Sequence, residues 1–160
     1  MKIAAYIGNH SSDTLRTRIG WKLNRAVQRG EFQQVTHVEA IHEEHGGGVV
    51  TMASSSLRDG GVRSKRVTLA RGHWRIFDMP SWDVARSISL LSETRGMEYD
   101  KRGALASAIP LPFFQEDENR WYCNEWVAYP FLRGAGIFGP AQFICIIVNL
   151  GAAEITDSFW

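Results

Sequence analysis

The chain has 160 residues, enough for one domain with a hydrophobic core and too few for two domains of ordinary size. Hydrophobic residues make up 44% of it and charged residues 22%, proportions that exclude a disordered chain and are typical of a globular one. The formal net charge of +1 excludes a general electrostatic attraction to nucleic acid or to an anionic membrane.

Residues 2–8 alternate enough to form a short strand or an extended lead-in. Only five apolar residues follow Lys2 before a turn, which is too short for the core of a signal peptide. No later segment reaches the roughly 18 apolar residues that a membrane span needs. We therefore expect a protein made in a cytoplasm, with no signal peptide and no membrane span.

A helix is predicted next, because Ser12 or Asp13 can cap it and apolar residues at four-residue spacing continue to about Arg29. Residues 34–42 are rich in β-formers and alternate, which predicts a strand. This strand would present two sets of side chains on opposite faces. The two sets are Val35, His37, Glu39 and Ile41, and Thr36, Val38 and Ala40.

The middle of the chain is predicted to be a series of antiparallel strands. Residues 45–48 form a glycine-rich turn, and 49–53 read as the returning strand of a hairpin. A second turn, Asp59-Gly60-Gly61, precedes two more β segments at 62–69 and 74–78.

The rest of the chain is predicted to be mainly helical. Pro80 and Ser81 open a helix of about fourteen residues that ends near Gly96, a short helix follows Asp100, and a Pro-rich loop spans 110–112. Another helix begins within 121–127 and ends before Gly134, and residues 142–149 read as a last apolar strand. The first of these helices would bury Trp82, Ala85, Ile88 and Leu91. The order predicts one α+β domain over residues 1–160, with an antiparallel sheet or half-barrel packed against helices.

Cys123 lies at the start of a predicted helix. The unpaired N–H groups of a first helical turn and the positive end of the macrodipole favour a thiolate, and the same amides can hold an oxyanion. The alternative is that Cys123 is a small buried hydrophobic residue, as most free cysteines are. Cys145 lies in an apolar run without a helix terminus, and we expect it in the core.

His37 and Glu39 share one face of the predicted strand. Residues two apart on a strand project side by side, so Glu39 could bind one ring nitrogen of His37 and present the other to a thiol. The alternative is a solvent-facing strand with an incidental His-x-Glu pair. His42 and His45 fall at or beyond the strand end, where we expect exposed turn residues.

We expect neither a metal ion nor a cofactor. The spacing of His37, His42 and His45 matches no established zinc signature. The run Gly46-Gly47-Gly48 lacks the Lys-Ser/Thr of a phosphate-binding loop and precedes a strand instead of a helix.

Four segments stand in a characteristic order along the chain: Thr36–Ala40, Ala53–Lys65, Gly96–Asp100 and Trp121–Val127. The last contains the cysteine motif Tyr122-Cys123-Asn124-Glu125-Trp126. In combination these segments resemble the circularly permuted branch of the NlpC/P60 papain-like superfamily, in which the strand histidine precedes the cysteine helix and the motif usually has Ser in place of Asn124. The likeness covers most of residues 1–150 and is strongest to small versions carried by bacteriophages and prophages.

The resemblance implies that Cys123 is a nucleophile and His37 a general base and acid. It implies further that Tyr99 lines the cleft and that the third member is a polar residue on the next strand, Thr51 or Ser54. Local geometry favours Glu39 as the third member. The cleft and oxyanion site would include Tyr122 and the backbone amides of Cys123 and Asn124, while Glu125 could be structural.

We therefore expect a thiol hydrolase that cleaves an amide through an acyl-enzyme, with the peptide bond of a cell-wall muropeptide as one candidate substrate. Two alternatives remain: a phage-encoded scaffold of the same fold that binds a host protein without catalysis, and an acyltransferase or deamidase on the same residues. The expected partner is a peptide or amide substrate, not nucleic acid, in the cytoplasm of a bacterium or a phage-infected host. The oligomeric state stays open.

Overall fold

The computed structural model describes residues 1–8, 31–108, 119–132 and 138–160. The strands in this part of the chain are β1 (Lys2–Tyr6), β2 (His37–Gly46), β3 (Val49–Ser56), β4 (Gly61–Thr68), β5 (Trp74–Asp78), β6 (Glu98–Tyr99), β7 (Arg120–Trp121) and β8 (Ala153–Glu154). The helices are α2 (Val84–Thr94), α3 (Lys101–Ala108), α4 (Cys123–Ala128), α5 (Pro140–Asn149) and α6 (Thr156–Phe159). The predicted helix that ends near Arg29 and the predicted loop at 110–112 lie outside the described residues.

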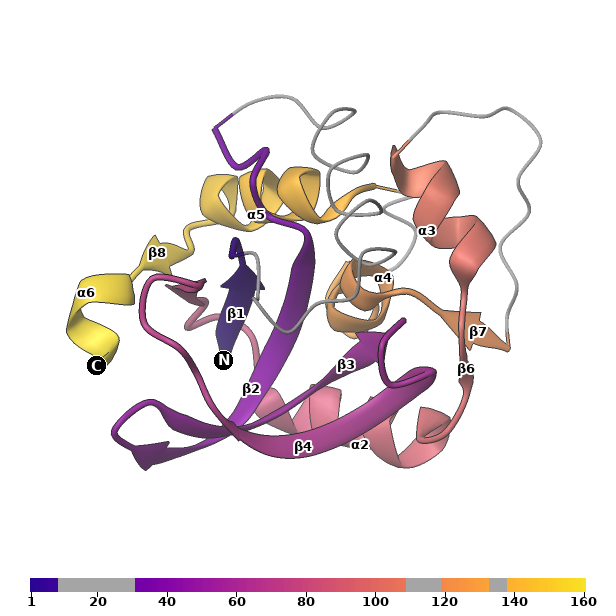
Figure 1. Cartoon of the computed structure of the whole chain (residues 1–160), viewed down its shortest axis with the longest axis horizontal. Helices are drawn as coiled ribbons and strands as arrows, with labels where there is room; N and C mark the ends of the chain where they lie inside the picture. The colour runs from indigo at the N-terminus through magenta and orange to yellow at the C-terminus, as the bar shows by residue number, and fades with distance from the viewer. Residues whose placement is uncertain (9–30, 109–118, 133–137) are drawn as a thin grey trace.

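The strands form one curled sheet, a half-barrel, in the order β7-β6-β4-β3-β2-β1-β5-β8 (Figure 1). Neighbouring strands are antiparallel except for the short parallel pair β6 and β7. Helix α4 packs against β2 and β3. The predicted α+β class, with a largely antiparallel sheet packed against helices, is confirmed.

Glycines shape both predicted turns. Gly46, the last residue of β2, and Gly47 and Gly48, which connect β2 to β3, all have positive φ, as a tight hairpin turn requires. In the Asp-Gly-Gly turn, Gly60 has a φ of +86°, and a Cβ on Gly61 would lie 2.0 Å from the carbonyl oxygen of Met97. Gly61 is therefore the residue that lets β4 approach the chain that enters β6.

The sheet separates two hydrophobic clusters. The larger one contains Val38, Ala40 and most of the buried side of α4 and α5, including the fully buried Trp126. The smaller one contains Ile41 and is covered in part by the C-terminal Trp160. Since Val38 and Ala40 pack in one cluster and Ile41 in the other, the predicted alternation is confirmed for residues 38–41. It is wrong for Val35, which was predicted on the face of Ile41 but packs with Val38 and Ala40, because it precedes β2.

The predicted strand at 142–149 is wrong, because these residues belong to helix α5. Gly139 caps this helix, Pro140 occupies its first turn, and the side chain of Gln142 accepts a hydrogen bond from the Gly139 N–H at 2.9 Å. The β-branched run suggested a strand, yet Phe143, Ile144 and Ile147 are the fully buried residues, at helical spacing.

The predicted helix near Pro80 is confirmed, but its buried face is partly wrong. Trp82 and Leu91 are buried, whereas Ala85 and Ile88 are exposed. Helix α2 begins only after its cap Asp83, so Trp82 precedes the helix and does not belong to its periodic face. The residues of α2 that face inward are Ser87, Leu90, Leu91 and Thr94.

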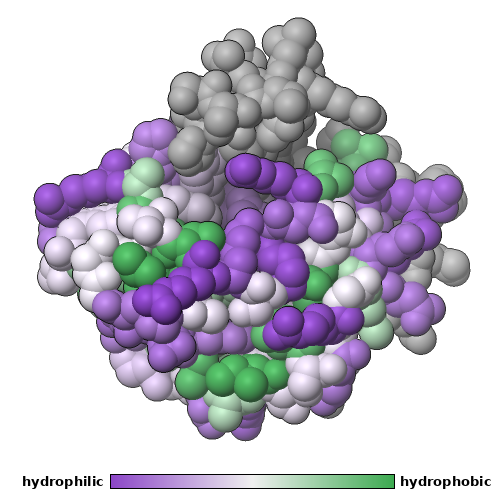
Figure 2. All heavy atoms as spheres, turned by 60° about the horizontal axis from the view of Figure 1, so that its bottom comes forward, coloured by the Kyte–Doolittle hydropathy of each residue, from purple (hydrophilic) through white to green (hydrophobic). Residues whose placement is uncertain are grey.

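Figure 2 draws one face of the described surface by hydropathy. On the face drawn in Figure 2, hydrophilic and hydrophobic residues interleave. Within the described ranges no helix combines the length and the apolar character that crossing a membrane requires.

Candidate active site

Cys123 is the first residue of α4, as predicted, and two serines at the end of β3 hold it there. Ser54 Oγ donates a hydrogen bond to the Cys123 carbonyl oxygen at 3.4 Å, and Ser55 Oγ donates to the Trp121 carbonyl oxygen at 2.6 Å. The two serines are fully buried. The Ser-Ser pair of the sequence therefore fixes the start of the cysteine helix to the sheet.

Side chains of α4 itself also stabilise the first turn of this helix. The Tyr122 N–H donates to a carboxylate oxygen of Glu125 at 3.2 Å, so Glu125 caps its own helix. The Asn124 side chain donates to the Phe138 carbonyl oxygen, and its own oxygen accepts from the Cys123 thiol at 3.6 Å. Glu125 and the Asn124 side chain therefore have structural contacts. The Cys123 side chain is buried, with 4% of the residue exposed.

His37 lies between Cys123 and Glu39. Its Nε2 atom is 2.9 Å from Oε1 of Glu39, and its ring is close enough to the Cys123 side chain for the two groups to interact electrostatically. Because Nε2 is engaged by Glu39, Nδ1 is left for proton exchange with the thiol. Burial alone would lower the pKa of His37, but the negative charge of Cys123 and hydrogen bonds to Cys123 and Glu39 raise it to about 9.

Glu39 is held as a buried carboxylate. Its side chain is 2% exposed, and Arg63 donates to both of its oxygens, at 2.6 Å from Nη1 and 2.5 Å from Nη2. Burial alone would raise the pKa of Glu39, but its hydrogen bonds and charge interactions with His37 and Arg63 lower it to about 2. The carboxylate is therefore ionised and available to orient and stabilise the His37 ring.

Two tyrosines flank the cysteine. Tyr99 on β6 pairs in register with Trp121 on β7, and Tyr122 directly precedes Cys123. Burial raises the pKa of Tyr99 well above its usual range, and the charge of Cys123 acts in the same direction. Tyr99 is thus close enough to Cys123 to interact electrostatically, and it stays a protonated hydroxyl, able to donate a hydrogen bond.

Thr51 is not brought to the Cys123–His37 pair. Its hydroxyl is 2.8 Å from Nε2 of His45, and it pairs in register with Glu43, farther along β2 than His37. Ser54 does lie beside Cys123, but it bonds to backbone oxygens and to no ring nitrogen. Of the three predicted third members, Glu39 is therefore the one that contacts His37.

The expectation of exposed turn residues at His42 and His45 is wrong. Both lie within β2 and are half-buried, since the strand continues to Gly46. His42 Nε2 is 2.9 Å from the hydroxyl of Ser87 on α2. In the described ranges, no three His, Cys, Asp or Glu residues come together as a metal site.

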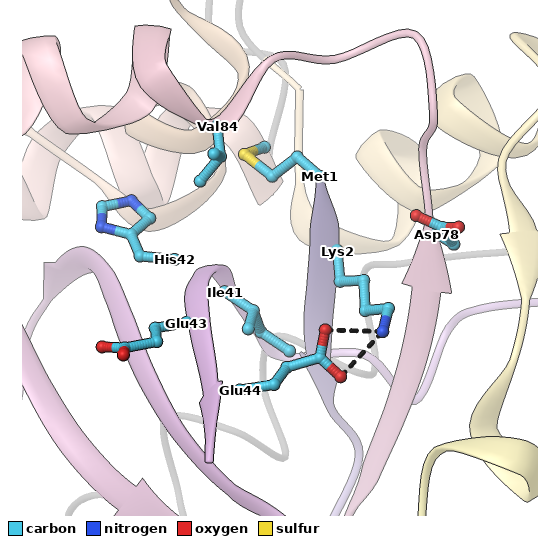
Figure 3. A pocket seen from close by; sticks show the side chains of 8 residues that line it. All are labelled: Met1, Lys2, Ile41, His42, Glu43, Glu44, Asp78 and Val84. Atoms are coloured by element: carbon cyan, nitrogen blue, oxygen red, sulfur yellow. Dashed lines mark hydrogen bonds and ion pairs between the residues drawn. The ribbon is translucent and has the colours of Figure 1, made fainter. Parts of the chain in front are cut away.

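A shallow depression lies along the part of β2 that follows Ile41 (Figure 3). Its volume is about 250 Å³, and its lining includes the ion pair between Lys2 Nζ and Glu44, at 2.6 Å. Neither His37 nor Cys123 lines it, so it is separate from the candidate site. Cys145, which was expected in the core, is half-buried on α5 and packs at the edge of the larger cluster.

Arg63 is the site residue that the sequence reasoning did not single out. It lies in the segment Ala53–Lys65, yet nothing in its local sequence connects it with Glu39. The candidate site is thus the contact series Cys123, His37, Glu39 and Arg63, with Tyr99 beside the cysteine. A comparison of the chain with models of protein families, with curated proteins and with solved structures finds no match.

Proposed function

We propose that the protein is a thiol-dependent hydrolase that cleaves amide bonds with Cys123, His37 and Glu39. The observation that carries the proposal is that His37 interacts electrostatically with the Cys123 side chain while its Nε2 is bound by the ionised Glu39. A thiol, an imidazole and a carboxylate in this order are what nucleophilic catalysis by a cysteine requires.

We further propose that the scaffold is a permuted NlpC/P60 papain-like domain. The strand histidine precedes the cysteine helix in the chain, and this helix packs against β2 and β3 of the curled sheet. The segments that carry the resemblance meet around Cys123, since Ser54 and Ser55 anchor its helix and Tyr99 lies beside it. The agreement of chain order with spatial convergence supports the proposal.

In the first half-reaction, the Cys123 thiolate, whose proton is held by the His37 imidazolium, attacks the carbonyl carbon of the amide. The backbone N–H groups of Cys123 and Asn124, in the first turn of α4, would hold the oxyanion of the tetrahedral intermediate. The C–N bond then breaks, and the His37 imidazolium donates its proton to the leaving amine. Cys123 is left as a thioester.

In the second half-reaction, His37 takes a proton from water, and the resulting hydroxide attacks the thioester carbonyl. The C–S bond breaks, the acid is released, and the pair of Cys123 thiolate and His37 imidazolium is restored. Glu39 stabilises the imidazolium that forms in each half-reaction. By the family resemblance, a peptide bond of a cell-wall muropeptide is the first substrate to test. An acyltransferase would differ only in using an amine or alcohol in place of water, and a deamidase in attacking a glutamine side chain.

The burial of Cys123 favours a second candidate function. With 4% of the residue exposed, the sulfur is largely covered in this structure. A papain-like scaffold that binds another protein without catalysis would keep the same packing and would need no access to the thiol. Reactivity of the thiol therefore separates the two candidates.

The deciding experiment is alkylation by iodoacetamide at about pH 6, followed by peptide mapping, with half-buried Cys145 as the internal control. We expect Cys123 to react about tenfold or more faster than a model thiol, because the model thiol is almost entirely protonated at this pH. His37→Ala should abolish this excess. If Cys123 reacts no faster than Cys145 and His37→Ala changes nothing, the hydrolase proposal fails and the scaffold remains. Substrates are then sought among synthetic muropeptides by mass spectrometry, with Cys123→Ser as the inactive control.

A further inference from the structure

Arg63 reaches Glu39 across an intervening strand. Arg63 is on β4 and Glu39 on β2, and β3 lies between them. Arg63 pairs in register with Ser54, and the β2–β3 register beyond the pair Ala40–Ala53 puts Ser54 opposite Glu39. The three residues therefore form a row across the sheet, and the small side chain of Ser54 leaves room for the guanidinium to pass above it.

The guanidinium uses its donors on several partners at once. Two nitrogens bind the two carboxylate oxygens of Glu39, and Nη1 also lies 3.3 Å from the Ser54 carbonyl oxygen. The remaining nitrogen, Nε, donates to Oδ2 of Asp59 at 2.6 Å, and Lys65 donates to the same oxygen at 2.7 Å. Arg63 is thus fixed at both ends, by a buried carboxylate on one side and by a partly exposed one on the other.

We propose that Arg63 is a positioning residue of the candidate site: by holding both oxygens of Glu39, it fixes the orientation of the His37 ring and moderates the negative charge beside it. The inference rests on the proposed function, since it assigns Arg63 a role in the same site. A planar two-point contact fixes a carboxylate in a way that a single ammonium does not. Without it, Glu39 would keep one partner, His37, and could rotate about its last bond.

The sign of the electrostatic effect follows from the charges around His37. Glu39 on β2 and the thiolate form of Cys123 on α4 favour the imidazolium, and the positive charge of Arg63 on β4 opposes it. Among the described residues, further ionisable groups around the pair include Asp59 and Lys65, which flank Arg63, Tyr6 on β1, which pairs in register with His37, and Tyr99 on β6, which interacts electrostatically with Cys123. Removal of the Arg63 charge should therefore make His37 harder to deprotonate.

The test is a pH titration of the His37 ring by NMR in the full chain, together with the solvent-exchange rate of its Nε2–H proton. For Arg63→Met, we expect the His37 midpoint to rise by about half a pH unit or more. We also expect the Nε2–H proton to exchange about tenfold faster, because Glu39 no longer holds it in one orientation. Arg63→Lys keeps the charge but not the two-point contact, so it should restore the midpoint and leave exchange fast. The matched control is Arg66→Met, on the same strand but exposed, which should change neither.

An unchanged midpoint and exchange rate in Arg63→Met would overturn the inference. If Arg63→Met does not fold, Arg63→Lys carries the test, and slow exchange in that variant would count against the positioning role. Alkylation of Cys123 in the unaltered chain is measured alongside. If Cys123 has the alkylation rate of an ordinary thiol, the proposed function itself is contradicted. If Cys123 reacts rapidly but Arg63→Met leaves the His37 midpoint and exchange rate unchanged, only the role of Arg63 is contradicted.

Discussion

Nε2 of His37 and Oε1 of Glu39 lie 2.9 Å apart on the same face of β2, two residues from one another. This contact links Glu39 on β2 to Cys123 on α4 through His37, because the His37 ring also interacts electrostatically with Cys123. A carboxylate in this position makes the histidine a stronger base and limits the rotation of its ring.

Replacing Glu39 with Gln should lower the pKa of His37. Gln has nearly the same shape as Glu but no negative charge, so the imidazolium loses one of the groups that raise its pKa to about 9. We expect the titration midpoint of the His37 ring, followed by NMR, to fall by about one unit. The matched control is Glu43→Gln, since Glu43 is also on β2 two residues from a histidine, His45, but is well exposed. A His37 midpoint that moves equally in both variants would contradict the role of Glu39.

Protonation of the Glu39 carboxylate should lower the free energy of unfolding in acid. The pKa of this carboxyl is about 2 in the folded protein and near 4.5 in the unfolded chain, so the stabilisation is complete above pH 4.5 and is lost as the pH falls towards 2. Between pH 6 and pH 3, we expect Glu39 to account for about 2 kcal/mol of lost unfolding free energy. Urea unfolding at several pH values measures it. The Glu39→Gln protein should show a correspondingly flatter acid profile, and an equally steep profile would refute the assignment.

The stability of the core between α4 and α2 should depend in part on one hydrogen bond. The indole N–H of the fully buried Trp126 donates to Oγ1 of Thr94 on α2 at 2.9 Å. Thr94→Val keeps the shape but leaves the indole N–H without this acceptor, which should cost about 1 to 3 kcal/mol of unfolding free energy. Thr68→Val, on the exposed end of β4, should cost no more than about 0.5 kcal/mol. Chemical denaturation of the two variants decides whether the bond contributes as expected.

Gly61→Ala should disturb the sheet next to Tyr99. An added Cβ would lie 2.0 Å from the Met97 carbonyl oxygen, and a backbone atom cannot move away by a change of rotamer as a side-chain atom can. We expect a loss of about 1 to 3 kcal/mol or a shift of β6 that displaces Tyr99. Gly47→Ala is the comparison, since it meets no atom within 4 Å and carries only the cost of its positive φ of 58°. Thermal unfolding should rank Gly61→Ala as the more destabilised protein, and the reverse ranking would show that β4 and β6 can separate without cost.

Much of the site could be predicted from the sequence because its signals are local. The alternation of residues 38–41, the glycines of the two turns and the position of Cys123 at a helix start each depend on neighbours in the chain. His37 and Glu39 lie on one strand, so their proximity follows from strand geometry alone. The same local reasoning failed at 140–149, where an apolar, β-branched run fits a buried strand and a buried helix equally well.

Local patterns in the chain were enough to predict the α+β class, the strand that carries His37 and Glu39, and the helix start that carries Cys123. Which polar residues join them depends on how the strands are arranged in the folded sheet. Arg63 reaches Glu39 because β4 lies two strands from β2 in a register that puts Ser54 between them, and Thr51 is excluded because the same register pairs it with Glu43. Strand register is a property of the folded sheet, since it depends on turn lengths, bulges and packing over distances that no local pattern records.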